Sequence, residues 1–110
     1  MNSEVRRDAI NHAAARSTDP TTSWEAARSL GLLTGLQERV WLTLALMTPV
    51  TDEQLYDAYN RSYGGRGQPI APSTVRSRRK ELQDLGLVEV VDRNGKTKGG
   101  RRCQRFQVAQ

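Results

Sequence analysis

Residues 73–88 read STVRSRRKELQDLGLV, and this stretch decides how the rest of the chain can fold. At about 100° per residue, three apolar side chains fall within about 80° of one another on one side of a helix. These side chains are Val75, Leu82 and Leu85. Ser73 can cap the first turn through its hydroxyl, and Gly86 can take the left-handed conformation that ends a helix. The stretch therefore predicts a helix over residues 73–85 that leads directly into an apolar strand.

The basic residues of this predicted helix, RSRRK at residues 76–80, do not all face the same way. Arg76 and Lys80 lie opposite the apolar side, Arg79 lies at its margin, and Arg78 falls inside the apolar sector. An arginine in the apolar sector can lay its methylene stem on the core and send its guanidinium to the rim. We therefore expect Arg78 to support the fold, and Arg76 and Lys80 to face outward.

The chain has 110 residues, enough for one domain with a single core, and its net charge of +5 is unevenly distributed. Residues 1–33 carry four Arg and four acids, and residues 34–60 carry one Arg and four acids. Residues 61–110 carry twelve Lys and Arg against four acids, a local charge of +8. Such a concentration is typical of proteins that bind polyanions, although a basic surface can also serve only solubility.

Several classes of protein are not indicated. No run approaches the roughly 20 apolar residues of a membrane span, and the acid-containing N-terminus does not resemble a secretory signal, so we expect a cytoplasmic protein without a membrane partner. Cys103 is the only cysteine, which excludes an internal disulfide and cannot by itself make a zinc site. GGRG at residues 64–67 lacks the Gly-Lys-Ser/Thr ending of a phosphate-binding loop. With no catalytic constellation, we expect no enzymatic activity, no cofactor and no metal.

The first 33 residues are predicted to form an N-terminal helical extension. An alanine-rich helix is indicated over residues 3–16, and a short helix over residues 23–30, SWEAARSL. Trp24 is expected to anchor the short helix, either against the core or in the surface of a partner. Because the apolar side of the first helix is mostly alanine, that helix can bury little area and can instead dock on a partner.

Residues 34–47, TGLQERVWLTLALM, have the strongest apolar pattern in the chain, and Thr34 and Gln37 have the spacing of a capping box. The predicted inward side of this helix comprises Leu33, Leu36, Val40, Trp41, Leu44 and Met47. A second capping box, TDEQ at residues 51–54, opens a further helix that continues through Tyr59. The acids near the start of that helix suit the positive end of its dipole and need no catalytic explanation.

After Gly86 the sequence predicts a two-stranded hairpin. Strands are indicated at residues 87–91 and 101–108, where β-branched and alternating apolar residues occur. Between them, Asn94-Gly95 is a turn signal and Gly99-Gly100 is a second flexible point. The Lys and Arg residues of this segment are expected to face water or a polyanion, because burying an uncompensated charge is unfavourable.

The order of three helices and a basic hairpin, with the motifs at residues 73–76 (STVR), 81–82 (EL) and 86–88 (GLV), resembles a winged helix-turn-helix domain. The resemblance implies a mostly α fold, with a three-helix core and a two-stranded wing over residues 34–110 and the helical extension over residues 1–33. Many members of this superfamily have small or aliphatic residues at the positions of Arg78 and Arg79. One of the two arginines is therefore expected to pair with an acid such as Asp57 or Glu81.

A finer similarity is to small winged-helix proteins carried by phages and prophages. It rests on TSWEAA at residues 22–27, STVRSRRKEL at residues 73–82 and GRR at residues 100–102. The similarity implies a phage or prophage transcriptional regulator, or an accessory factor in replication or recombination. The sequence contains no ligand-binding segment, so an effector-sensing regulator is not supported.

The resemblance implies that the helix over residues 73–85 enters the major groove of double-stranded DNA, and that a basic wing, residues 92–102, lies on the backbone or in the minor groove. Arg76 is expected to contact a base, because its planar bidentate donor matches the two acceptors of guanine. The contacts expected from the recognition helix are Ser73, Thr74, Arg76, Ser77, Arg79 and Lys80. Those expected from the wing and the preceding loop are Arg66, Arg93, Lys96, Lys98, Arg101 and Arg102.

Two further questions stay open at the level of the sequence. Binding to symmetric half-sites would imply a homodimer, for which the N-terminal helices are the candidate interface, and an architectural role in DNA is also compatible with the pattern. Alternatively, the domain is a protein–protein interaction module without direct DNA readout, with a host or phage protein as its partner. In that case the acidic segment 34–60, the alanine-rich helix and Trp24 would form the contact surface.

Overall fold

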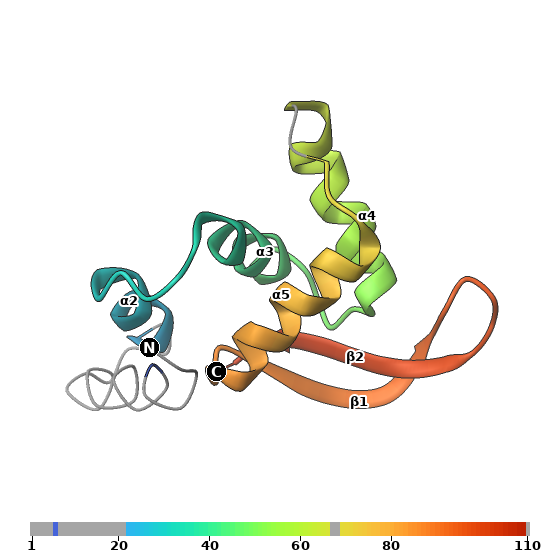
Figure 1. Cartoon of the computed structure of the whole chain (residues 1–110). Helices are drawn as coiled ribbons and strands as arrows, with labels where there is room; N and C mark the ends of the chain where they lie inside the picture. Colours follow the sequence, from blue (N-terminus) through green and yellow to red (C-terminus); the bar gives the residue numbers. More distant parts are fainter. Residues whose placement is uncertain (1–5, 7–21, 67–68, 110) are drawn as a thin grey trace.

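The computed structural model describes Arg6, residues 22–66 and residues 69–109 (Figure 1). Its elements, in chain order, are α2 (Thr22–Ser29), α3 (Gly35–Ala45), α4 (Asp52–Tyr63), the short 3-10 helix η1 (Gly64–Arg66), α5 (Pro72–Asp84), β1 (Val88–Lys96) and β2 (Arg102–Val108). The described part is thus a set of helices followed by a two-stranded antiparallel sheet, in the order that the sequence predicted. The helix predicted over residues 3–16 lies outside the described residues, apart from Arg6.

Capping boxes begin both α3 and α4, as predicted. The hydroxyl of Thr34 accepts the Gln37 amide at 3.2 Å, and the Thr34 amide donates to the Gln37 side chain at 3.0 Å. Thr51 and Gln54 make the same reciprocal pair, at 3.2 and 3.0 Å. Each box satisfies two amides that the first turn of a helix leaves without intrahelical partners, so both helices begin where the sequence places them.

The start of α5 differs from the prediction, whereas its end agrees. Ala71 occupies the N-cap and makes no side-chain capping bond, and Pro72 is the first helical residue. Proline suits that position because its φ is already helical and it has no amide to satisfy. The prediction that Ser73 caps α5 is therefore wrong. Gly86, with a φ of 80°, ends the helix as predicted, and the amide after it, of Leu87, donates to the Leu82 carbonyl at 2.9 Å.

The core lies where α3, α4, α5 and the hairpin meet, and Figure 1 shows the hairpin running from the C-terminal end of α5 past the start of α4. The most deeply buried apolar side chains of the core are Ala27, Val40, Leu44, Leu55, Tyr59, Val75, Leu82, Leu85, Leu87, Val88 and Phe106. The predicted inward side of α3 is confirmed, since Val40, Trp41 and Leu44 are buried and the other predicted members pack partly buried against them.

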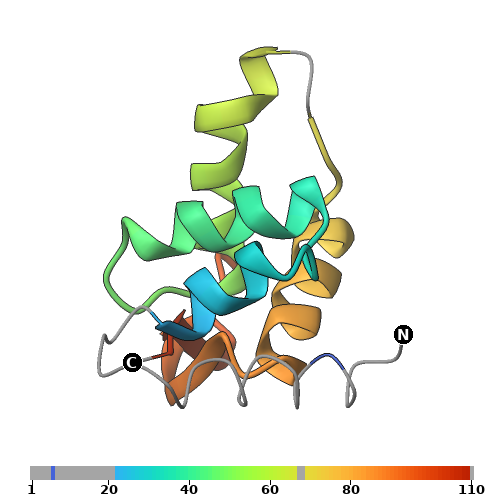
Figure 2. The ribbon, with the colours of Figure 1, turned by 90° about the vertical axis from the view of Figure 1, so that its left-hand side faces the viewer.

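α2 precedes α3 in the chain and lies at the same end of the molecule (Figures 1 and 2), and two tryptophans join these helices. The rings of Trp24 and Trp41 are stacked, with centroids 4.1 Å apart and planes 1° from parallel. The Trp41 indole N–H donates to the Leu87 carbonyl at 3.0 Å, so the stack is also tied to the start of the hairpin. Of the two predicted alternatives for Trp24, anchoring against the core is confirmed. The division of the chain at residues 33 and 34 stays a prediction.

The hairpin turns later in the chain than predicted. β1 continues through Asn94 and Gly95 to Lys96, and the turn is closed by the Thr97 and Gly100 backbones, with the Thr97 amide donating to the Arg101 carbonyl at 2.8 Å. Gly95 pairs with Cys103 inside the sheet. The turn signal at Asn94-Gly95 was therefore misread: this glycine permits close packing, since a Cβ there would lie 2.5 Å from Cγ2 of Thr51.

Val50, in the connection between α3 and α4, pairs with β2 on the edge of that strand opposite to β1. The Val50 amide donates to the Phe106 carbonyl at 3.0 Å, and the Phe106 amide donates to the Val50 carbonyl at 2.7 Å. This bridge fixes the α3–α4 connection against β2. It also places the start of α4 next to the hairpin, which determines the surroundings of the candidate site.

Candidate nucleic-acid interface

One side of α5 packs on the core and the opposite side is open. Val75 and Leu82 are fully buried, and they dock the helix against α3 and α4. Ser73, Arg76, Ser77 and Lys80 are exposed, and together with Arg79 they border a shallow hollow of about 450 Å³. Thr74 is half-buried. Five of the six residues predicted on the recognition helix thus border one surface.

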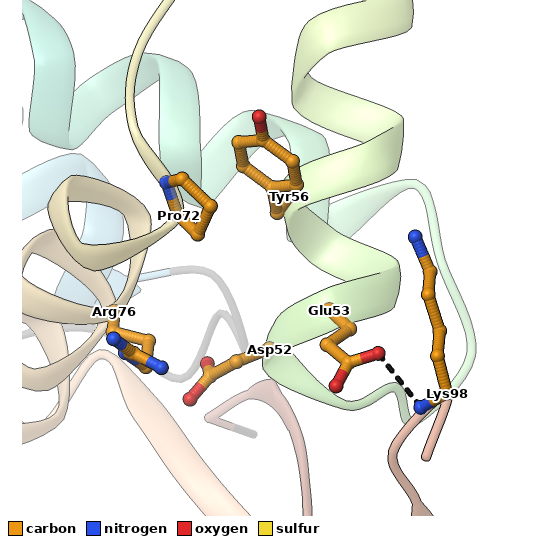
Figure 3. A pocket seen from close by; sticks show the side chains of 6 residues that line it. All are labelled: Asp52, Glu53, Tyr56, Pro72, Arg76 and Lys98. Carbon is orange, nitrogen blue, oxygen red and sulfur yellow. Dashed lines mark hydrogen bonds between the residues drawn. The ribbon is translucent and has the colours of Figure 1, made fainter.

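Arg76 lies where this surface meets α4 and the hairpin. Besides the α5 hollow, it borders one of about 360 Å³ with Tyr56 and Pro72 (Figure 3), and one of about 240 Å³ that reaches Gln104 on β2. Among the described residues, its guanidinium has no acidic partner within ion-pair distance. The Arg76 guanidinium, at the junction of α5, α4 and β2, is therefore positioned to bind an anionic or hydrogen-bond-accepting group of an outside ligand.

Arg79, also predicted as a DNA contact, is paired within the fold, and its contact with DNA stays a prediction. Its guanidinium donates to both carboxylate oxygens of Asp52, at 2.9 and 2.7 Å, and to the Gln83 side chain at 2.9 Å. It also lies over the Phe106 ring, 3.9 Å from the centroid, and its side chain is only 11% exposed. Arg79 therefore joins α5, α4 and β2. Arg79 thus supports the fold in addition to Arg78, because α4 packs against the margin of α5.

Arg78 pairs with Glu81, one of the two acids predicted for this role. Nε of Arg78 lies 2.7 Å from Glu81 Oε1, and the Gln37 side chain donates to the same oxygen at 3.0 Å. Arg78 thus also contributes to the junction of α5 with α3. Nζ of Lys80 lies 2.8 Å from Oδ1 of Asp84. Both side chains are well exposed, so screening by solvent leaves this ion pair weak.

The hairpin carries the second group of predicted contacts. Arg93, Lys96, Lys98, Arg101 and Arg102 are all exposed, as their charges required. The Arg102 guanidinium donates to the Arg93 carbonyl at 2.8 Å and leans toward the Asn94 side chain, 3.4 Å away. These hydrogen bonds orient Arg102 on the hairpin, and because both acceptors are neutral they leave its positive charge uncompensated. Four of the five, Lys98 being the exception, have no acidic partner in the described part of the chain.

Lys98 turns back toward α4. Its amide donates to Glu53 Oε2 at 2.9 Å, and its ammonium lies 3.1 Å from Asp57 Oδ2. The sequence pattern indicated only that these acids suit the dipole of α4, and it did not predict their contacts with Lys98. Their spacing of four residues places them on one side of a helix, but only the packing of the hairpin shows that this side meets Lys98.

The remaining predicted contact, Arg66, has a side chain outside the described residues. Elsewhere on the hairpin, Arg105 pairs with Asp92, donating to its Oδ1 at 2.8 Å. The hydrogen bond from Arg105 and then that from the Asn94 amide lower the pKa of Asp92 from 3.8 to about 2. This pair therefore stays charged at neutral pH and leaves Arg105 less able to serve an outside ligand.

The described residues contain no group of three or more His, Cys, Asp or Glu side chains that could hold a metal ion. Nor is any helix among these residues both long and apolar enough to cross a membrane. Comparison of the chain with protein-family models and with curated proteins finds no match.

Proposed function

We propose that the chain is a winged helix-turn-helix protein that binds double-stranded DNA. α3, α4 and α5 would form the three-helix core, and the β1–β2 hairpin would be the wing. The order of the elements supports this proposal, as does the Val50 bridge that ties the helices to the hairpin. The observation that carries it is the position of Arg76 on the open side of α5, beside a hairpin with five exposed cations. Arg76 and four of those five cations have no acidic partner among the described residues.

In the proposed complex, α5 enters the major groove and Arg76 reads a base. Ser73, Thr74 and Ser77 lie near the helix N-terminus, where hydroxyls and amides favour phosphate oxygens. The phosphate contacts are assigned to the exposed cations Lys80, Arg93, Lys96, Arg101 and Arg102. Five such contacts give a log–log dependence of the binding constant on salt with a slope of about −4.5.

The test is selection of bound sequences from a random duplex pool, followed by titration of the selected and a random duplex. Arg76→Ala should lose about 1–3 kcal/mol of binding free energy on the selected duplex and much less on the random one. Arg76→Lys is the matched control, because it keeps the charge but not the bidentate geometry, and it should lose most of the same preference. Lys96→Ala should weaken both duplexes alike and flatten the salt slope by about 0.9.

Equal losses on both duplexes for Arg76→Ala would reject the assignment of Arg76 as the base-reading residue. Failure of the unaltered chain to bind any duplex at about 50 mM salt would reject DNA binding itself. The size of the complex would also show whether one or two copies bind, and so whether the site is symmetric.

A second candidate function, binding to a protein partner, is favoured by an apolar surface away from α5. Leu46 at the end of α3 is 90% exposed and Leu42 is 42% exposed. Both border a hollow of about 180 Å³ that Met47 and Tyr63 also line. If this surface is the functional one, Leu46→Glu should abolish capture of the partner, and the chain should bind no duplex at low salt.

A further inference from the structure

The tip of the hairpin is held against α4 by charged groups. The Lys98 amide donates to a Glu53 carboxylate oxygen at 2.9 Å, a bond drawn in Figure 3, and the Lys98 ammonium lies 3.1 Å from Asp57. Lys98 and Glu53 border the same hollow as Arg76. The cation at the tip of the hairpin therefore already has a carboxylate partner on α4.

We propose that Glu53 and Asp57 form a latch that competes with DNA for Lys98, so that DNA must open this contact before the tip of the wing can bind phosphate. The proposal rests on the proposed function and deepens it. The carboxylate of Asp57 offsets the charge of the Lys98 ammonium, so a nearby phosphate is attracted more weakly while this pair is closed. In the latched state, Lys98 then contributes less to DNA binding than Lys96 on the same hairpin, which has no acidic partner among the described residues.

The exposure of the pair determines how strong the latch is. The Lys98 side chain is 73% exposed and that of Asp57 is 43% exposed, so water and salt screen their attraction. An exposed pair of this kind shifts a competing equilibrium by about two- to five-fold. The latch is thus weak enough for the dense charge of a duplex to displace it, yet large enough to measure.

Helix chemistry separates the roles of the two acids. Glu53 is in the first turn of α4, where a carboxylate is also favoured by the helix dipole, whereas Asp57 is one turn further along. Asp57→Asn therefore removes the partner of the ammonium without disturbing the start of the helix. It is the cleaner variant for opening the latch.

The test is a double-mutant cycle on DNA affinity at fixed, low salt. In the unaltered background, Lys98→Gln should change the Kd for the selected duplex by less than about two-fold. In the Asp57→Asn background, the same substitution should weaken binding by a further two- to five-fold or so, because Lys98 is then available to DNA. Asp84→Asn is the matched control: it removes an equally exposed acid, 46% against 43%, that pairs with Lys80 rather than Lys98.

A cost of Lys98→Gln that is the same in all three backgrounds would overturn the latch while leaving DNA binding intact. If none of the variants binds duplex, the proposed function fails and the competition fails with it. A measurement without DNA separates the two failures: the latch requires that Asp57→Asn increase the backbone mobility of residues 97–100 in nitrogen relaxation, whereas Asp84→Asn leaves it unchanged. Unchanged mobility in Asp57→Asn would show that the acids do not hold the tip.

Discussion

Replacing Gly95 by alanine should separate the packing role of this glycine from a role in the turn. Gly95 is buried within β1, opposite Cys103. A Cβ at this position would lie 2.5 Å from Cγ2 of Thr51, 2.9 Å from Cγ of Arg105 and 3.2 Å from the Cys103 carbonyl oxygen. All three atoms would have to move, and the nearest belongs to a stiff, branched side chain that caps α4.

The expected loss follows from these contacts. Overpacking at a tight site typically costs about 1–3 kcal/mol. Thr51 is 3% exposed and its hydroxyl accepts the Gln54 amide, so displacing it also weakens a cap worth about 1 kcal/mol. Alanine also reduces the conformational freedom of the unfolded chain, which offsets about 0.4–1 kcal/mol of this loss of stability. We therefore expect Gly95→Ala to lower the free energy of unfolding by about 2 kcal/mol, which for a domain of this size lowers Tm by roughly 8–15 °C.

The assay is urea and thermal unfolding followed by circular dichroism, with Gly99→Ala as the control. Gly99 lies at the tip of the same hairpin, and the nearest atom to an added Cβ there is Thr97 Oγ1 at 3.8 Å, an ordinary contact. Both variants change the unfolded chain in the same way, so their difference reports the folded state alone. Equal stability of the two variants would refute the close packing of Gly95 against Thr51.

Two further predictions concern ion pairs. Arg79→Gln should lower the free energy of unfolding by about 3 kcal/mol, because it leaves the half-buried Asp52 carboxylate without its bidentate partner. Adding Asp52→Asn to this variant should lower the free energy of unfolding little further. If chemical denaturation instead shows that the losses of the two substitutions add, the pairing is contradicted. The pKa of Asp92 is lowered from 3.8 to about 2 in the folded chain, so its stabilising effect is fully present above pH 4 and should be lost as the pH falls toward about 2. Unfolding of Asp92→Asn should lack this component, and an unchanged pH profile between about 4 and 2 would count against the Arg105 pair.

The boundaries of most elements could be predicted from the sequence because local chemistry sets them. Thr34 with Gln37, and Thr51 with Gln54, satisfy the first amides of their own helices, and Gly86 ends α5 with a positive φ. These are interactions between residues at most a few positions apart, so spacing alone identifies them. The misplaced cap of α5 was also local: Pro72 begins a helix without any side-chain bond.

The turn of the hairpin could not be predicted because its cause is distant. Asn94-Gly95 is a frequent turn sequence, and nothing nearby distinguishes it from the pair Gly99-Gly100. What decides between them is Thr51, which packs against Gly95 from the α3–α4 connection and leaves no room for a side chain. Helical periodicity placed Arg79 only at the margin of the apolar side of α5, and a residue there is buried or open according to where α4 packs.

The charge of the site shows most clearly what folding adds to the sequence. Along the chain, the acids of residues 34–60 and the cations of residues 61–110 are separate, which suggested that the positive charge of the C-terminal half stays uncompensated by the acids of residues 34–60. In the fold, Asp52 is bound to Arg79 and Asp57 to Lys98, so two of those cations are compensated by α4. The predicted electrostatic contribution to DNA binding therefore comes from fewer residues than the sequence indicated. Each phosphate contact makes the log–log salt slope more negative by about 0.9. A measured slope much steeper than about −4.5 would therefore mean that DNA also binds the cations that are paired with α4. Lys98 would be the first of these, because its ion pair is more exposed than that of Arg79.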